Sequence, residues 1–98
     1  MKYIGLDVTF KGLTADQPSV TKRMVVSFPD DLVHSMVADA MKHAARRQWR
    51  GADVKVSTAG FIEATARDTH GKSESLGIKS DANDARRFNM ANYGGNIL

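Results

Sequence analysis

Apolar and polar residues alternate along residues 3–10, and this pattern predicts a half-buried β-strand. Ile4, Leu6, Val8 and Phe10 occupy the even positions. A period of two is the spacing of side chains on one face of a strand. We therefore expect these four side chains to contribute to a core.

The alternation stops over a polar stretch at residues 11–19 and resumes over residues 20–28. The polar stretch contains Gly12 and Pro18, two residues that commonly form turns. Because two alternating segments flank it, we predict a long β-hairpin.

Residues 29–50 have the pattern of an amphipathic helix. Pro29 suits the first turn of a helix, and Asp30 and Asp31 complement its positive end. Gly51 is expected to stop it. An apolar stripe with spacings of three and four residues should lie against the sheet, and its members are Val33, Met36, Val37, Ala40, Met41 and Ala44.

The rest of the chain predicts short elements. Residues 54–58 and 61–66 are either two strands joined by a turn at residues 59–60 or one long bent strand. Residues 68–71 predict a turn with Gly71 in the left-handed conformation, leading to a short strand around residues 76–78. Ser80 or Asp81 could cap a short helix that ends before Gly94.

This order of elements, ββαββ(β)α, predicts an α+β fold. We expect one domain over residues 1–98, with an antiparallel sheet of four to five strands and one long helix packed on one face, in two layers. Residues 89–98, which are rich in asparagine and glycine, are expected to form a mobile tail.

The composition restricts the class of protein. A chain of 98 residues without cysteine has no disulfides and no thiolate zinc site, which favours a reducing cytoplasm. No apolar segment is long enough to suggest a membrane span or a signal peptide, and we expect Met1 to be the native start. The net charge of +3 is spread evenly along the sequence, so any nucleic-acid binding must depend on local clustering.

One catalytic motif requires a test, because residues 66–73 fit a relaxed phosphate-loop pattern that ends in Lys72 and Ser73. That motif needs a helix to begin at the lysine, so that its N-terminal amides can cradle phosphate. The following residues include Gly77 and alternate as a strand does. We therefore interpret the segment as a hairpin turn.

The histidines do not predict a metal or catalytic site. His34 and His43 are nine residues apart, which places them on opposite sides of a helix. His43 lies four residues after Asp39 and can pair with it, but an exposed helix face explains this spacing. His70 lies in the predicted turn. We expect neither a metal nor a cofactor, and no enzymatic activity.

A cluster of cations at the end of the predicted long helix is the main candidate for a binding site. It consists of Lys42, His43, Arg46, Arg47 and Arg50, with Trp49 among them. Cations near a helix C-terminus are favoured by the macrodipole, but five within nine residues exceed what capping needs.

Two features of this cluster affect its interpretation. Lys42, Arg46 and Arg50 repel one another at four-residue spacing, as expected where an anionic partner binds. Trp49 is either a core residue or an anchor for the partner. Further basic pairs could converge with the cluster, namely Arg86 with Arg87 on the short helix and Lys22 with Arg23 on the second strand.

In overall character the chain resembles the small accessory proteins that phages and prophages encode, including inhibitors of restriction and CRISPR systems. The shared features are a short chain from Met1, no cysteine, no catalytic motif and a hairpin, helix and sheet plan. The resemblance implies a stoichiometric binder that blocks a host protein or ribonucleoprotein complex.

These observations lead to three hypotheses. The first is a non-enzymatic inhibitor that binds its partner through the basic helix face. The second is a nucleic-acid-binding protein that uses the same cations, in which case its affinity falls steeply with salt. The third, compatible with both, is homodimerisation through the sheet edge or through Ile97 and Leu98.

Overall fold

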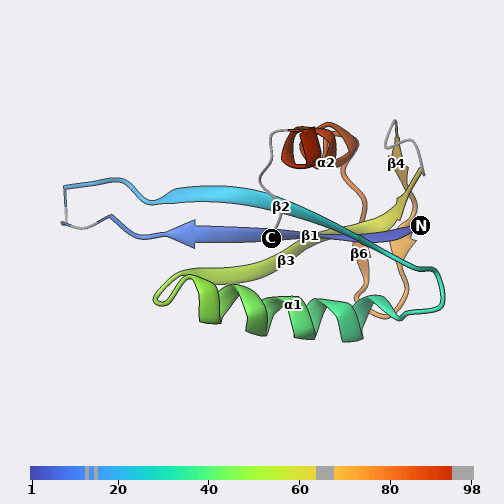
Figure 1. The fold of residues 1–98 in the computed structure, drawn as a ribbon, viewed down its shortest axis with the longest axis horizontal. Coiled ribbons are helices and arrows are strands. Elements are labelled where there is room, and N and C mark those ends of the chain that lie inside the picture. Colours follow the sequence, from blue (N-terminus) through green and yellow to red (C-terminus); the bar gives the residue numbers. More distant parts are fainter. Residues whose placement is uncertain (13, 15, 64–67, 94–98) are drawn as a thin grey trace.

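The computed structural model describes residues 1–12, 14, 16–63 and 68–88 completely and residues 89–93 by their backbone (Figure 1). The elements in chain order are β1 (Lys2–Phe10), β2 (Val20–Phe28), α1 (His34–Gln48), β3 (Asp53–Ile62), β4 (Thr69–His70), β5 (Lys72–Ser73), β6 (Ile78–Lys79) and α2 (Asp84–Tyr93). The predicted α+β class is confirmed.

Four of the strands form a curled antiparallel sheet in the order β2-β1-β3-β4. The strands β1 and β2 pair along their full length, from Lys2 opposite Phe28 to Phe10 opposite Val20. The predicted long hairpin is therefore confirmed. A central position between β2 and β3 explains why β1 is buried on both faces near its start, where residues 3–6 are all buried.

The third strand is the long bent strand that was one of the two sequence-based alternatives. It runs from Asp53 to Ile62 without the turn that residues 59–60 could have formed. Its register against β1 shifts at Ser57, because Gly5 pairs with Thr58 whereas Leu6 pairs with Val56. Such a bulge bends the strand and redirects side chains. Residues 64–66 of the predicted strand lie outside the described part of the chain.

The even-numbered face of β1 packs against α1 and forms the larger core. Ile4, Leu6 and Val8 are buried there with Ala38 and Ala45 of α1. The prediction that the even positions of this strand contribute to the core is confirmed. Each fully buried side chain of this size contributes about 1.5–3 kcal/mol by leaving water, so this face anchors the helix to the sheet.

The odd-numbered face of β1 is covered by α2, so the sheet has a helix on each side (Figure 1). Tyr3 and Ile62 form a small apolar cluster with Val25 and Phe88 on this face. The predicted two-layer arrangement with a single covered face is wrong. The reason is that α2, predicted only as a short helix, brings both buried apolar and buried polar groups to the second face.

The prediction of one long helix over residues 29–50 is wrong at both ends. Residues 29–32 form a turn in which the Leu32 N–H bonds the Pro29 carbonyl, and Val33 is an extended N-cap residue. Gly51 takes the left-handed conformation, φ 83°, so the chain turns there as predicted. The helix itself has 15 residues.

The helix also packs with a different face from the predicted one. Val37 and Met41 contact the core, but Ala40 and Ala44 are exposed and Met36 is 66% exposed. The buried side is formed by His34, Ala38 and Ala45. Apolar residues therefore line two faces of α1, one packed against the sheet and one exposed to solvent. The exposed face is part of the candidate binding site.

The C-terminal elements differ in order from the prediction. The strand β4 pairs with β3, and β5 pairs with β6 in a separate two-stranded sheet. Gly71 has φ 76°, the left-handed conformation expected for it. The helix α2 begins at Asp84, later than the sequence predicted, and Asp81 accepts the N–H of Asn83 in the turn before it rather than capping the helix itself. Of the predicted mobile tail, residues 94–98 are outside the described residues.

Candidate functional site

A row of exposed residues runs along the solvent side of α1. Met36, Ala40, His43 and Arg47 are all exposed, and their spacing of four, three and four residues keeps them on one line of a helix that turns about 100° per residue. Ala44 is exposed beside this row. The face changes along the helix from apolar at its N-terminal end to cationic at its C-terminal end.

The cationic end of this face is formed by Arg46, Arg47 and Arg50. All three side chains are exposed, and no acidic residue in the described ranges pairs with them. Arg46 and Arg47 lie in the last turn of α1, and Arg50 follows its C-cap residue Trp49. These arginines add charge at the negative helix end, but they form no ion pair with the residues that the structure describes.

The other predicted members of the cluster differ in their surroundings. Lys42 is half-buried and pairs with Asp39, with 3.5 Å between Nζ and Oδ1. This pairing replaces the pairing of Asp39 with His43 that the sequence had suggested. His43 is exposed next to the arginines. The predicted stripe of like charge therefore loses Lys42, whose charge is balanced locally.

Trp49 belongs to the core edge. Its ring packs edge-on against Phe10, with 5.9 Å between the ring centroids and an interplanar angle of 84°. It is only half-buried and contacts the cluster between the sheet and α1. Of the two alternatives for this residue, core packing fits its position.

The second predicted basic pair does not converge with the first. Arg86 and Arg87 lie on α2, across the sheet from α1 (Figure 1). Arg86 is exposed. Arg87 donates to Asp81 and Asp84 at 3.0 and 2.8 Å, so its charge is balanced. Arg87 therefore stabilises α2 rather than extending the basic face of α1.

The pair on β2, Lys22 and Arg23, does not converge with the cluster on α1 either. Lys22 is exposed near the hairpin end, whereas Arg23 is half-buried and bonds Asp7 and Asp84. Neither member of this pair lies on α1. The convergence of the basic clusters is thus limited to residues of α1 and the turn that follows it.

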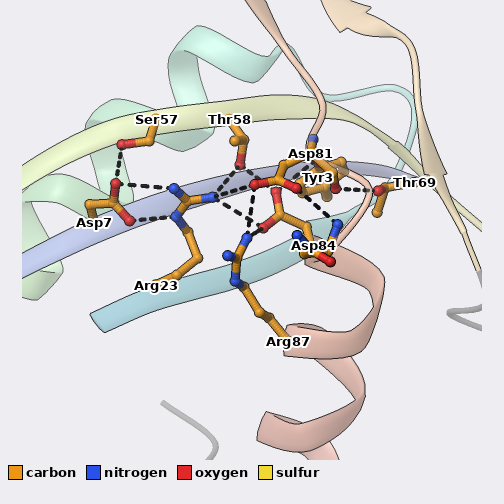
Figure 2. Close-up of polar contacts among 10 residues, drawn as sticks. Tyr3, Asp7, Arg23, Ser57, Thr58, Thr69, Asp81, Asp84 and Arg87 are labelled. Atoms are coloured by element: carbon orange, nitrogen blue, oxygen red, sulfur yellow. Dashed lines mark hydrogen bonds and ion pairs between the residues drawn. The ribbon is translucent and has the colours of Figure 1, made fainter. Parts of the chain in front are cut away.

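A network of charged and polar side chains fills the space between the sheet and α2 (Figure 2). Asp84 is its centre, with an exposed fraction of 0%. Its Oδ2 accepts the hydroxyls of Tyr3 and Thr58, at 2.9 and 2.5 Å. Its Oδ1 accepts Nη1 of Arg23 and Nη1 of Arg87, at 3.1 and 2.8 Å. Four donors therefore satisfy one buried carboxylate.

The network continues along the sheet through Asp7. Both carboxylate oxygens of Asp7 accept from the guanidinium of Arg23, and Ser57 donates its hydroxyl to Oδ2 at 2.6 Å. The hydrogen bonds from Arg23 lower the pKa of Asp7, and those with Asp7 raise the pKa of Arg23. The bulge at Ser57 allows this hydroxyl to reach the α2 side.

At the start of α2, Asp81 joins the network to the helix. The backbone N–H of Asn83 and then the guanidinium of Arg87 lower the pKa of Asp81. The hydroxyl of Tyr3 accepts the N–H of Asp81 at 3.0 Å. Burial has the largest effect on the Tyr3 hydroxyl and raises its pKa to about 12. The ring therefore stays neutral and bridges strand and helix.

Gly5 provides the space in which the network forms. A Cβ at this position would lie 2.0 Å from the Thr58 hydroxyl and 3.4 Å from Oδ2 of Asp84. Within the described residues, no fully buried side-chain nitrogen or oxygen lacks a hydrogen-bond partner. Because every buried group is paired, the network acts as a fixed attachment of α2 to the sheet.

Sequence reasoning missed this network, although it singled out two of its arginines. One indication was present in the sequence. Tyr3, Gly5 and Asp7 lie on the face of β1 opposite α1, and a tyrosine and a carboxylate need hydrogen-bond partners if another element buries them. A second was the spacing of Asp84 and Arg87, which allows an i,i+3 pair. Only the tertiary position of α2 joins these signals.

The histidines lie apart, as the sequence predicted. His34 is buried, its Nε2 lies 2.9 Å from the Gly60 carbonyl, and its ring meets Phe28 and Phe61 edge-on. His70 stacks on Phe61. In the described part of the chain, no group of three histidine, cysteine or acidic residues could hold a metal ion.

A shallow depression of about 420 Å³ lies beside His34. Lys2, Lys72 and Glu74 contribute charges to its lining, and Ser75 contributes a hydroxyl. The Ser75 oxygen accepts the N–H of Ser35 and the Lys2 ammonium donates to the Leu32 carbonyl. The Ser75 contact holds the start of α1 against the β5–β6 hairpin, and the Lys2 contact holds the preceding turn against β1. The lining residues include no nucleophile in contact with a base.

The segment that resembled a phosphate loop contains two short strands in its described part. Lys72 and Ser73 form β5, and residues 74–77 turn back to β6 with Gly77 N–H bonding the Ser73 carbonyl at 2.8 Å. No helix begins at Lys72. The described residues 68–73 include β4 and β5, so they form neither a phosphate loop nor the predicted hairpin turn, and Ala66 and Arg67 lie outside the described residues.

No family model matches the chain, and no curated protein and no solved structure matches it either. Over the residues that the structure describes, no helix is long and apolar enough to cross a membrane.

Proposed function

We propose that this protein is a non-enzymatic binding protein that blocks a partner through the exposed face of α1. The observation that supports this most directly is the group of three exposed arginines, Arg46, Arg47 and Arg50, without ion-pair partners among the described residues. Charges that are neither paired nor needed for packing are available to a partner. That partner presents an acidic surface.

The exposed apolar side chains next to the arginines favour a protein partner. Met36 is 66% exposed, and Ala40 and Ala44 lie between it and the cations. Interfaces between proteins combine an apolar centre with a polar rim and are enriched in arginine and methionine. A phosphate backbone would use the arginines but would gain nothing from Met36.

We infer further that the protein acts stoichiometrically, as an inhibitor of the type that phages encode against host nucleic-acid-handling complexes. The support is the combination of a small fold, a surface with unpaired cations and a buried polar network whose groups are all paired. A surface that binds nucleic acid is itself basic, so the protein would bind an acidic surface elsewhere on such a complex. Such a surface would attract the arginines of α1.

The test is affinity enrichment of partners from a bacterial lysate with quantitative mass spectrometry. Replacing Arg46 and Arg47 by Glu should remove the enriched partner and leave the protein folded, with only a modest decrease in melting temperature, because both side chains are exposed and interact with the rest of the protein chiefly through the helix dipole. Arg86→Glu is the matched control, since Arg86 is exposed on α2 across the sheet. Equal enrichment with the double variant and the wild type would exclude α1 from the site.

The alternative function is direct nucleic-acid binding by the same arginines. Arg46, Arg47 and Arg50 are adjacent at one helix end, and contacts to phosphate would make the affinity fall steeply with salt. Fluorescence anisotropy with DNA and RNA at two salt concentrations measures this. Binding at low salt that is lost in the Arg46→Glu, Arg47→Glu variant would favour this alternative, and no binding at low salt would exclude it.

A further inference from the structure

The solvent face of α1 has a pattern that is complementary to itself. Val33, Met36, Ala40, His43 and Arg47 follow one another at spacings of three, four, three and four residues. This is the spacing of the contact positions in paired helices. Val33 is 42% exposed and Met36 66% exposed, so neither is used by the core.

The residues just before α1 and those around its C-terminal end carry opposite charges. Asp30 and Asp31 are exposed just before α1, with Asp30 71% exposed and near the N-terminal ammonium of Met1. Arg47 and Arg50 are exposed at the other end. If two such faces meet in antiparallel orientation, the acidic end of each lies against the basic end of the other.

We propose that α1 packs antiparallel against α1 of a second copy of this chain, around a two-fold axis beside Ala40. With Ala40 facing its own symmetry copy, Met36 faces Ala44 of the second copy. Asp31, in the turn before α1, then lies at the end of the second copy's helix where Arg47 and Arg50 are exposed. The small side chain of Ala40 allows the two helices to approach closely, and every contact occurs twice, as a two-fold interface requires.

The expected association is weak. A helix of 15 residues is about 22 Å long, and one helix pair buries less than the roughly 800 Å² per partner of a standard interface. The dimer should therefore form at high protein concentration and exchange rapidly. This inference does not rest on the proposed function, but the two share Arg47, so dimerisation should compete with binding of an acidic partner.

The absence of cysteine from the sequence allows a direct test by disulfide cross-linking. Ala40→Cys places a thiol beside the proposed axis, where it meets its own copy. Gln48→Cys is the matched control, because it is also exposed on α1. In the antiparallel arrangement its two copies lie about 24 Å apart along the helices, which is too far for a disulfide.

We expect Ala40→Cys to form a cross-linked dimer at least tenfold faster than Gln48→Cys under mild oxidation. Adding Arg47→Glu to Ala40→Cys should slow the reaction several-fold, and adding Asp31→Arg as well should restore it. Equal rates for the two cysteine positions would overturn the proposal. A fast reaction at position 40 that ignores Arg47→Glu, or a missing rescue, would overturn the antiparallel charge pairing.

The charge-swapped pair also separates this inference from the proposed function. A chain with Asp31→Arg and Arg47→Glu should regain self-association but not the binding of an acidic partner. Loss of cross-linking with retained partner binding would therefore remove only the dimer. Partner binding that survives Arg46→Glu with Arg47→Glu would remove only the proposed function, because cross-linking of Ala40→Cys is measured without a partner.

Discussion

The attachment of α2 depends on a single buried carboxylate, so Asp84→Ala should destabilise the protein more than any other change of one acidic residue in the described chain. The substitution removes the acceptor of four hydrogen bonds, from Tyr3, Arg23, Thr58 and Arg87. The two hydroxyl groups and part of each guanidinium then lose their acceptor at a position that is fully buried.

The size of the effect follows from the surroundings of the two arginines. Removing one partner of a buried ion pair costs about 3–5 kcal/mol. Arg23 keeps Asp7 and Arg87 keeps Asp81 as partners, so we expect the lower end, about 3 kcal/mol. For a domain of about 100 residues each kcal/mol lowers the melting temperature by about 4–8 °C. The expected decrease is therefore about 12–24 °C.

Thermal and urea unfolding monitored by circular dichroism measure this loss. Asp39→Ala is the matched control, because it removes a carboxylate from α1 that is 73% exposed and pairs only with Lys42. Its effect should stay below about 1 kcal/mol. Asp84→Asn keeps one acceptor oxygen and should fall between the two. A melting temperature of Asp84→Ala within about 4 °C of the wild type would contradict the argument that the carboxylate holds α2.

Three further predictions concern the packing and the pH dependence. Because the pKa values of Asp7 and Asp81 are lowered, their contribution is complete above the unfolded value of 3.8 and is lost as the pH falls through the folded values. The urea midpoint should thus be constant from neutral pH to about pH 5 and fall in more acidic solution, and Asp7→Asn should reduce this fall. Gly5→Ala should lower the free energy of unfolding in urea by about 1–3 kcal/mol, because the added methyl group clashes with Thr58. The loss should be smaller in a Thr58→Ala background, and an equal loss would contradict the clash. Met36→Ala should leave the melting temperature nearly unchanged whereas Met41→Ala should lower it; equal losses would refute the assignment of the solvent face.

The strands near the N-terminus were predictable because their signal is local. The alternation in residues 3–10 and 20–28 fixes both the strand type and the face that enters the core, and it predicted the hairpin correctly. The bulge at Ser57 could not be predicted, because it depends on the register against β1. The start of α1 was also misplaced, since residues 29–32 satisfy their backbone in a turn that the composition of a helix start equally allows.

The orientation of α1 could not be predicted because the helix has apolar residues on two faces. Ala38 and Ala45 are small and are buried, whereas Met36 and Ala40 follow an equally regular spacing and are exposed. Periodicity identifies a stripe, but it does not choose between two stripes. The choice depends on the shape of the sheet, whose central side chains leave room for alanines. For the same reason the solvent face of α1 was first assigned to the core.

The distribution of charge connects the buried network with the proposed binding face. The network contains three carboxylates, Asp7, Asp81 and Asp84, and two guanidiniums, Arg23 and Arg87, so its net charge is −1. Since the whole chain carries +3, the remaining residues carry +4. The fold therefore uses more acidic than basic groups inside, and the excess of positive charge lies outside the network. On α1 that excess is concentrated in arginines without ion pairs among the described residues. This local concentration, rather than the net charge, favours α1 as the binding surface.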